Sequence, residues 1–284
     1  MTRAQIIGPD KLSGREVGDV NLNLYSLRLL AEGDSWFSLG SLPPHNLLMA
    51  LQFDKSSVVL DLAYPGERVT EMFRRMCDYG AEFAGWMTMR STWSWDAILL
   101  SGGGNDLIAA LPHLLRTDID TSAVDPAHPE NLVDADALAL LDRYLNESYR
   151  GFVACRDRRD SPNANVPMIA HTYDYPTPND APARAFGVPI AGPWIYPQFN
   201  GRLPQAAWQP LIDHLLDHVA ETLLALPAQL PNFHVVDTRG TLTRAAEGAQ
   251  GDSNDWENEI HPNAGGYRKL AARVADEVLQ RVGA

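Results

Sequence analysis

Short apolar runs alternate along this chain with segments in which apolar residues recur at helical spacing. Continuous apolar runs bounded by turn residues are typical of strands buried on both faces of a parallel sheet. Five such runs occur, over 27–31, 58–62, 97–100, 166–170 and 233–236. Apolar stripes with the period of an amphipathic helix cover 69–77, 138–152, 211–223 and 270–279. Few folds other than a layered α/β arrangement accommodate this order.

The alternation predicts an α/β fold, because neighbouring parallel strands need crossover helices that pack on the sheet. We expect a three-layer sandwich around a mostly parallel, five-stranded sheet. The chain of 284 residues shows no internal repeat and no convincing boundary. A single domain over 1–284 is therefore predicted, with a loop-rich insertion around 112–210 that includes a proline-rich stretch.

Composition excludes several classes of partner and site. The net charge of −13 disfavours nucleic acid, whose affinity for proteins comes mainly from Lys and Arg. The two cysteines, Cys77 and Cys155, are too few for a disulfide framework, and no CxxC motif occurs. No run approaches the roughly 18 apolar residues of a membrane span, and no secretory signal opens the chain. We expect a cytoplasmic protein, with a mature secreted form as the open alternative; the sequence does not predict an oligomeric state.

Polar clusters follow the predicted strands at their carboxyl ends. Ser35 comes after the first strand, Gly66 after the second and Asn105 after the third, while His261 precedes the last helix. Ligands of such folds bind beyond this edge of the sheet, where backbone N–H groups collect. The sequence therefore predicts that these four residues form one site.

The residue types at this site suit acyl transfer. A serine hydroxyl is a weak nucleophile that needs a base, and His261 is the best candidate for that base. The oxyanion of such a reaction needs preorganised donors. The N–H groups of Ser35 and of Gly66, the latter expected at a helix start, and the side-chain amide of Asn105 are the candidates.

Four short motifs carry a resemblance to a known family. Gly33-Asp-Ser35, the Gly66 turn, the Gly-Gly-Asn-Asp run over 103–106 and His261-Pro-Asn263 resemble the four blocks of the GDSL-type, or SGNH, hydrolases, in the family's order. The resemblance spans 27–275. It implies a flavodoxin-like sandwich and hydrolysis of esters, thioesters or acetylated sugars without a cofactor or metal. It also implies an oxyanion hole made of Ser35, Gly66 and Asn105.

The sequence departs from the family at the residue that orients the histidine. The family's acid stands three residues before the histidine, where this chain has Asn258. Loss of that carboxylate in a serine triad can reduce kcat by about 10⁴, because the imidazole takes the wrong tautomer. Asp255, on the same loop, and Asn258, through its carbonyl oxygen, are the main candidates, and Glu257 and Glu259 stay open.

These residues predict a serine carboxylesterase that acts on small or medium acyl esters, with a small-molecule ester as its partner. Trp36 and Trp256 adjoin the predicted nucleophile and base, so we expect them to shape the substrate pocket. Two alternatives remain open: a carbohydrate acetylesterase, and a catalytically dead binding protein with the same cleft. A nucleotide-binding protein is a weaker rival, because no G-x-G-x-x-G or P-loop lysine occurs.

Overall fold

A six-stranded sheet lies at the centre of the structure, a computed structural model that describes residues 1–12, 19–38, 45–77, 94–159 and 161–283. Each pair of neighbouring strands in this sheet is parallel, in the order β10–β7–β6–β3–β5–β2. The strands are β2 (Gln5–Ile7), β3 (Leu27–Gly33), β5 (Ser57–Asp61), β6 (Ala97–Ser101), β7 (Met168–His171) and β10 (Phe233–Val236).

The sheet confirms the predicted fold class and adds one strand to it. The five predicted strands are β3, β5, β6, β7 and β10, and the first of them lies between the second and the third, as in flavodoxin-like folds. The additional strand, β2, has three residues and extends the sheet beside β5. So short a strand carries too little pattern to be distinguished from a loop.

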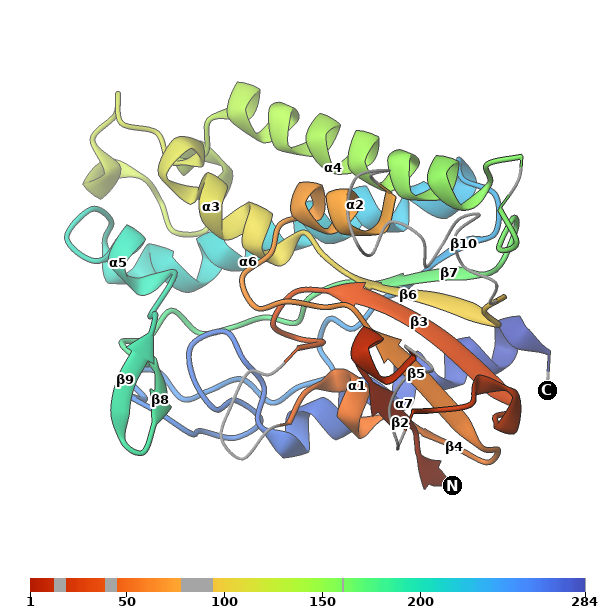
Figure 1. The fold of residues 1–284 in the computed structure, drawn as a ribbon. Helices are drawn as coiled ribbons and strands as arrows, with labels where there is room; N and C mark the ends of the chain where they lie inside the picture. Colours follow the sequence, from red (N-terminus) through yellow and green to blue (C-terminus); the bar gives the residue numbers. More distant parts are fainter. Residues whose placement is uncertain (13–18, 39–44, 78–93, 160, 284) are drawn as a thin grey trace.

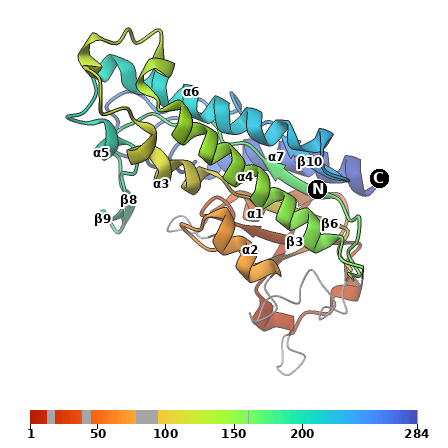
Figure 2. The same ribbon diagram turned by 90° about the horizontal axis from the view of Figure 1, so that it is seen from above.

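Helices cover both faces of the sheet (Figure 1), and the view from above shows α4 and α6 running side by side (Figure 2). On one face lie α2 (Val69–Cys77), α3 (Gly104–Leu114), α4 (Ala135–Arg156) and α6 (Gln205–Leu224). On the other face lie α1 (Leu47–Ala50) and α7 (Ala264–Val282). The sequence did not predict α3, because Pro112 interrupts its apolar stripe near the end of the helix.

Smaller elements connect these layers. Two antiparallel pairs lie outside the central sheet: β1 (Thr2–Arg3) with β4 (Gln52–Phe53), and β8 (Ala183–Ala185) with β9 (Val188–Ala191). The range 112–210 holds this second hairpin, a short helix α5 (Tyr196–Phe199), and also α4 and β7 of the layered fold. Single 3₁₀ turns occur at Pro9–Leu12, Leu22–Leu24, Thr121–Ala123, Pro129–Leu132 and Leu226–Ala228. Within the described ranges, none of the helices has the length and apolar character needed to cross a membrane.

The start of α7 fixes the loop that carries His261. Asn263 caps this helix, because its Oδ1 accepts hydrogen bonds from the N–H groups of Gly265 and Gly266 at 2.9 and 3.0 Å. Its Nδ2 donates to the carbonyl oxygen of Asn254 at 2.8 Å. One side chain thus ties the helix to the loop before it.

We therefore expect Asn263→Ala to lower the free energy of unfolding by about 1 kcal/mol, the usual effect of losing an N-cap. Asn263→Ser, which keeps a capping oxygen, should lose less than half as much. Urea unfolding followed by circular dichroism measures both. Equal stability of Asn263→Ala and the wild-type protein would contradict this role.

Candidate active site

Ser35 lies in a tight turn directly after β3. Asp34 organises this turn: its carbonyl oxygen accepts from the N–H groups of Phe37 and Ser38 at 3.1 and 3.0 Å, and its Oδ1 accepts from the Trp36 N–H at 2.9 Å. Ser35 itself is almost fully buried. The turn therefore presents the Ser35 hydroxyl from a rigid backbone at the carboxyl edge of the sheet.

Asp34 is held in turn by side chains of two neighbouring strands. The Ser101 hydroxyl, at the end of β6, donates to Asp34 Oδ1 at 3.0 Å, and the Tyr173 hydroxyl, just after β7, donates to Oδ2. Burial raises the pKa of Asp34 to about 6, against the effect of these hydrogen bonds. Asp34 thus anchors the turn that carries Ser35.

The loop between β10 and α7 brings His261 to Ser35. Its Nε2 lies 2.8 Å from the Ser35 Oγ, although 226 positions separate the two residues in the chain. The loop folds back on itself, because the Glu257 N–H donates to the His261 carbonyl oxygen at 2.9 Å. Two of the residues expected to work together are therefore in hydrogen-bond contact.

Asn258 is the residue that holds the other side of the His261 ring. Its Oδ1 lies 2.9 Å from His261 Nδ1, and the same oxygen accepts from the backbone N–H groups of Ile260 and His261 at 3.2 and 3.0 Å. Two backbone donors require an acceptor, so they fix which atom of the amide faces the ring. Nδ1 must then carry the proton, and Nε2 presents its lone pair to the Ser35 hydroxyl.

Asp255, Glu257 and Glu259, the three carboxylates that could have oriented His261, form their contacts with other groups. Asp255 accepts from the Thr243 N–H at 2.7 Å and pairs with the Lys269 ammonium group. Glu257 pairs with His45 at 2.9 Å. The structure therefore brings Asn258 to His261 Nδ1 and places Asp255, the other main candidate, against Thr243 and Lys269.

Glu259 fixes a different part of the site. Its carboxylate accepts from the backbone N–H groups of Trp194, Ile195 and Tyr196, the last two at 2.8 and 2.6 Å. Burial raises the pKa of Glu259 to about 7. The Trp194 indole packs edge-on against His261, with 5.1 Å between ring centroids. Sequence reasoning did not identify Trp194 as part of the site, because Trp194 lies in a proline-rich stretch that carries no periodic signal.

His261 is buried as a neutral imidazole. Burial, and then the nearby His45, lower its pKa to about 4. The imidazole is therefore unprotonated at neutral pH and able to accept a proton. Asn258 brings no negative charge to stabilise the imidazolium that would follow.

A narrow, mostly apolar cavity of about 40 Å³ lies beside Ser35. Trp36 and Trp256 both line it, and both are otherwise packed in the core. The rest of its wall is mostly aliphatic and comes from α3, α6 and the loops, including Leu107, Ile108, Ile195, Ile212 and Leu216. The volume holds a few water molecules at most, so it matches the size of a short acyl group.

The two other predicted oxyanion donors lie at the ends of the neighbouring strands. Asn105, in the first turn of α3, lines the cavity with Ser35 and donates one amide N–H to the Glu67 carbonyl oxygen at 3.0 Å. Gly66 has φ +82° and sits in a turn three residues before α2, rather than at the helix start. A positive φ at this turn position favours glycine. The Tyr64 N–H, bonded to the Gly33 carbonyl oxygen at 2.9 Å, attaches the turn to the end of β3.

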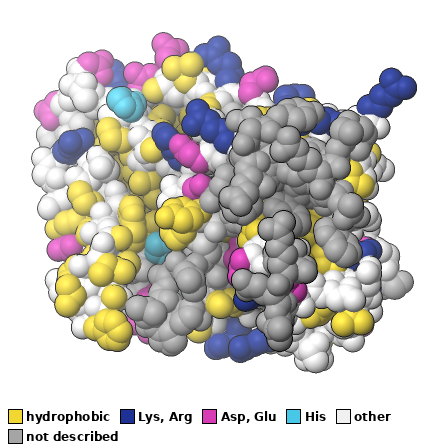
Figure 3. Space-filling model, viewed as in Figure 1, with side chains coloured by type: hydrophobic (Ala, Val, Ile, Leu, Met, Phe, Trp, Pro, Cys, Tyr) yellow, Lys and Arg dark blue, Asp and Glu magenta, His cyan; other side chains and the backbone are white. Residues whose placement is uncertain are grey.

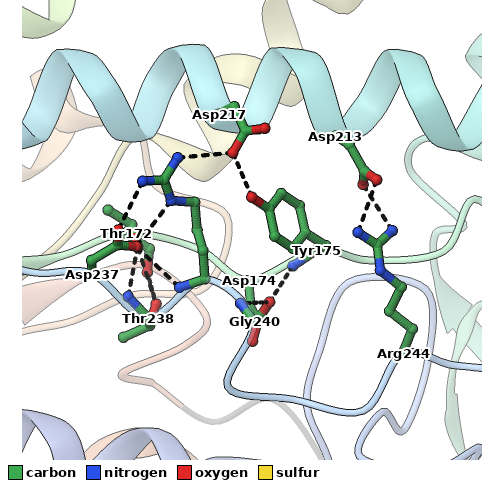
Figure 4. A network of polar contacts seen from close by, with 10 residues as sticks. Thr172, Asp174, Tyr175, Asp213, Asp217, Asp237, Thr238, Gly240 and Arg244 are labelled. Carbon is green, nitrogen blue, oxygen red and sulfur yellow. Dashed lines mark hydrogen bonds and ion pairs between the residues drawn. The ribbon is translucent and has the colours of Figure 1, made fainter. Parts of the chain in front are cut away.

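A polar network fixes the wall of the cavity that follows β7 (Figure 4). Asp174 accepts from the N–H groups of Gly240 and Leu242 at 2.8 and 2.7 Å, which joins the loops after β7 and β10. Tyr175 donates to Asp217 on α6. Arg244 forms two hydrogen bonds with Asp213, on the same helix, at 2.9 and 2.8 Å. Asp174 is therefore an anchor of this wall.

Comparison with solved structures returned lipases. The lipase Lip_vut3 from a goat rumen metagenome superposes with a TM-score of 0.55 at 15% identity, over 91% of this chain and 100% of that chain. An extracellular lipase from Streptomyces rimosus gives 0.53 at 15% identity, over 88% of this chain and 99% of that chain. The chain has the fold of these lipases. The predicted resemblance is thus confirmed at the level of the fold. Neither a scan against protein-family models nor a search of the curated proteins found a match.

The uncharged partner of His261 leads to a pH prediction. If His261 is a base, kcat/KM must fall as pH drops through its pKa, and burial places that fall near pH 4 rather than in the usual histidine range. Asn258→Asp should shift this acid limb of the kcat/KM profile to higher pH, by about one pH unit or more, because a carboxylate stabilises the imidazolium and raises the pKa of His261.

Asn258→Ala is the matched control, because it removes the acceptor without adding charge. It should lower kcat by about 10² or more, because nothing then holds the His261 proton on Nδ1 and the ring can take the wrong tautomer. The measurement is a pH profile of ester hydrolysis for all three proteins. An acid limb that stays in place in Asn258→Asp would contradict the role of Asn258.

Proposed function

We propose that this protein is a serine hydrolase that cleaves carboxylic esters. The hydrogen-bonded chain from Ser35 through His261 to Asn258 carries the proposal, with 2.8 Å between Oγ and Nε2 and 2.9 Å between Nδ1 and Oδ1. A buried serine beside a neutral histidine of fixed tautomer is an activated nucleophile. The fold shared with two lipases agrees with ester hydrolysis.

The reaction starts with proton transfer from Ser35 Oγ to His261 Nε2. The oxygen attacks the ester carbonyl carbon, and the electron pair of the carbonyl moves onto its oxygen. The imidazolium keeps its Nδ1–H bonded to Asn258 Oδ1 and gives its Nε2 proton to the alcohol oxygen of the ester. At that step the electron pair on the oxyanion re-forms the carbonyl, the C–O bond to the alcohol breaks, and the acyl-enzyme remains. A water molecule, activated by His261, hydrolyses the acyl-enzyme and restores Ser35.

Donors at three strand ends would stabilise the oxyanion. These are the Ser35 N–H, the Gly66 N–H and the Asn105 amide, which has a second N–H beyond the one bonded to Glu67. Each such donor typically contributes about 10² to 10³ in kcat. Ser35 and Gly66 lie in turns after β3 and β5, and Asn105 lies in the first turn of α3 after β6, so the donors need little reorganisation when charge develops.

The cavity beside Ser35 favours a small acyl group. Its apolar wall suits a hydrocarbon chain, and its volume of about 40 Å³ restricts the length of that chain. Within carboxylic esters, acetyl and similarly short acyl groups are therefore the proposed substrates. The alcohol part stays outside this cavity.

Ser35→Ala should abolish hydrolysis of nitrophenyl acetate, because no other group then forms the acyl-enzyme. Ser38→Ala, which alters a buried serine of the same turn, should keep turnover within a few-fold. Circular dichroism establishes that both variants fold. Turnover by folded Ser35→Ala at the wild-type rate, or none by the wild-type protein with any short acyl ester, would contradict the proposal.

Leu216→Ala should shift the acyl preference toward longer chains. The change widens the cavity, so the ratio of kcat/KM for the butanoate ester to that for the acetate ester should rise. Leu141→Ala is the control, because Leu141 is similarly buried, at 7% exposure against 6%, but belongs to α4. Both variants should lose about 2 to 5 kcal/mol of stability. An unchanged ester ratio in Leu216→Ala would contradict the assignment of the cavity.

A further inference from the structure

The β8–β9 hairpin exposes apolar side chains that the proposed chemistry does not use. It projects from the body of the molecule at the lower left of Figure 1, and hydrophobic side chains gather at the corresponding place in Figure 3. Phe186 is 96% exposed, Val188 62% and Ile190 65%. Contiguous exposed apolar surface of this kind commonly marks an interaction site.

The turn of the hairpin keeps its phenylalanine at a conformational cost. Phe186 and Gly187 form the two-residue loop, with φ +51° and +81°. Both values are positive, as in a type I′ turn, whose first position favours Asn, Asp or Gly. A bulky residue with positive φ is uncommon and strained. The side chain at the tip is therefore one that turn geometry alone would not select.

The charge around the hairpin differs from that of the rest of the chain. From 181 to 212 the sequence has no Asp or Glu, although the whole chain has 36. The same stretch contains Arg184 and Arg202. A protein of net charge −13 is repelled by acidic surfaces. The hairpin itself adds no negative charge to that repulsion, and acidic groups, Asp252 and Glu257 among them, line the pocket that Arg184 shares at its base.

The hairpin is poorly suited to bind a second copy of the chain. A stable interface buries about 800 Å² on each partner, and the three exposed apolar side chains of the hairpin supply at most about half of that. Edge-to-edge pairing is also disfavoured, because Pro189 in β9 has no N–H to donate. A small apolar tip without carboxylates suits insertion among lipid headgroups instead.

The hairpin is directly connected to the candidate active site. After β9 ends at Ala191, the chain reaches Trp194, which packs on His261, and Ile195, which lines the cavity beside Ser35. Glu259 holds both residues by their N–H groups. A surface that received the hairpin tip would lie close to the mouth of the site.

We propose that the β8–β9 hairpin docks this protein onto a zwitterionic lipid surface through Phe186, Val188 and Ile190. This binding is separate from the proposed ester hydrolysis, since it needs neither Ser35 nor His261. It would place the site where amphiphilic esters are concentrated.

The test is co-sedimentation of the purified full-length chain with phosphatidylcholine vesicles. The double variant Phe186→Asn, Ile190→Thr removes the apolar tip, while Asn suits the turn and Thr suits the strand. The variant should therefore fold at least as well as the wild-type protein. The matched control, Leu24→Ser with Leu140→Gln, removes two exposed leucines elsewhere, 75% and 58% exposed.

We expect the wild-type protein, the control and Ser35→Ala to bind vesicles equally, and the hairpin variant to bind at least tenfold less. Hydrolysis of dissolved nitrophenyl acetate should be unchanged in the hairpin variant, which separates this proposal from the catalytic one. Absence of wild-type binding, or equal binding by the hairpin variant, would overturn it. So would sedimentation velocity showing a dimer that the hairpin variant loses, because a second copy would then be the occupant.

Discussion

The contact between the Ser35 hydroxyl and the His261 imidazole joins two loops from opposite ends of the chain. It exists because the carboxyl ends of parallel strands meet at one edge, and because the loop before α7 folds back onto that edge. The turn held by Asp34 fixes one partner, and Asn258 fixes the other. Displacement of either support by about 1 Å would remove the contact while leaving most of the fold intact.

Asn258 shows how a neutral side chain can hold a histidine ring in the orientation that a carboxylate would give it. A free asparagine can present either its oxygen or its nitrogen to a histidine, and the nitrogen would favour the wrong tautomer. Here the N–H groups of Ile260 and His261 select the oxygen. Geometry is thus preserved, and what is lost is charge, consistent with the low pKa of His261.

The sequence predicted the layered fold because buried parallel strands and amphipathic helices leave strong periodic patterns. It missed β2, which has three residues, and α3, which contains Pro112. It also placed Ser35, Gly66, Asn105 and His261 at the same edge, since strand ends can be read from the apolar runs. Which group faces His261 depends on how a short loop folds back, and residue spacing alone left both Asp255 and Asn258 open, with Glu257 and Glu259 behind them.

The β8–β9 hairpin lies within the range that the sequence predicted only as loop-rich. Its strands are too short to show an alternating apolar pattern, and the residue types alone do not reveal that Phe186, Val188 and Ile190 are exposed. Its proposed role fits the small cavity, because the proposed hydrolysis places only the acyl group inside that cavity. The most direct test of the central claim is reaction of the protein with a small fluorophosphonate, followed by mass spectrometry of its peptides. The account predicts one adduct, located on Ser35, that forms more slowly when His261 is replaced by alanine. A folded protein without an adduct, or with the adduct on another residue, would contradict it.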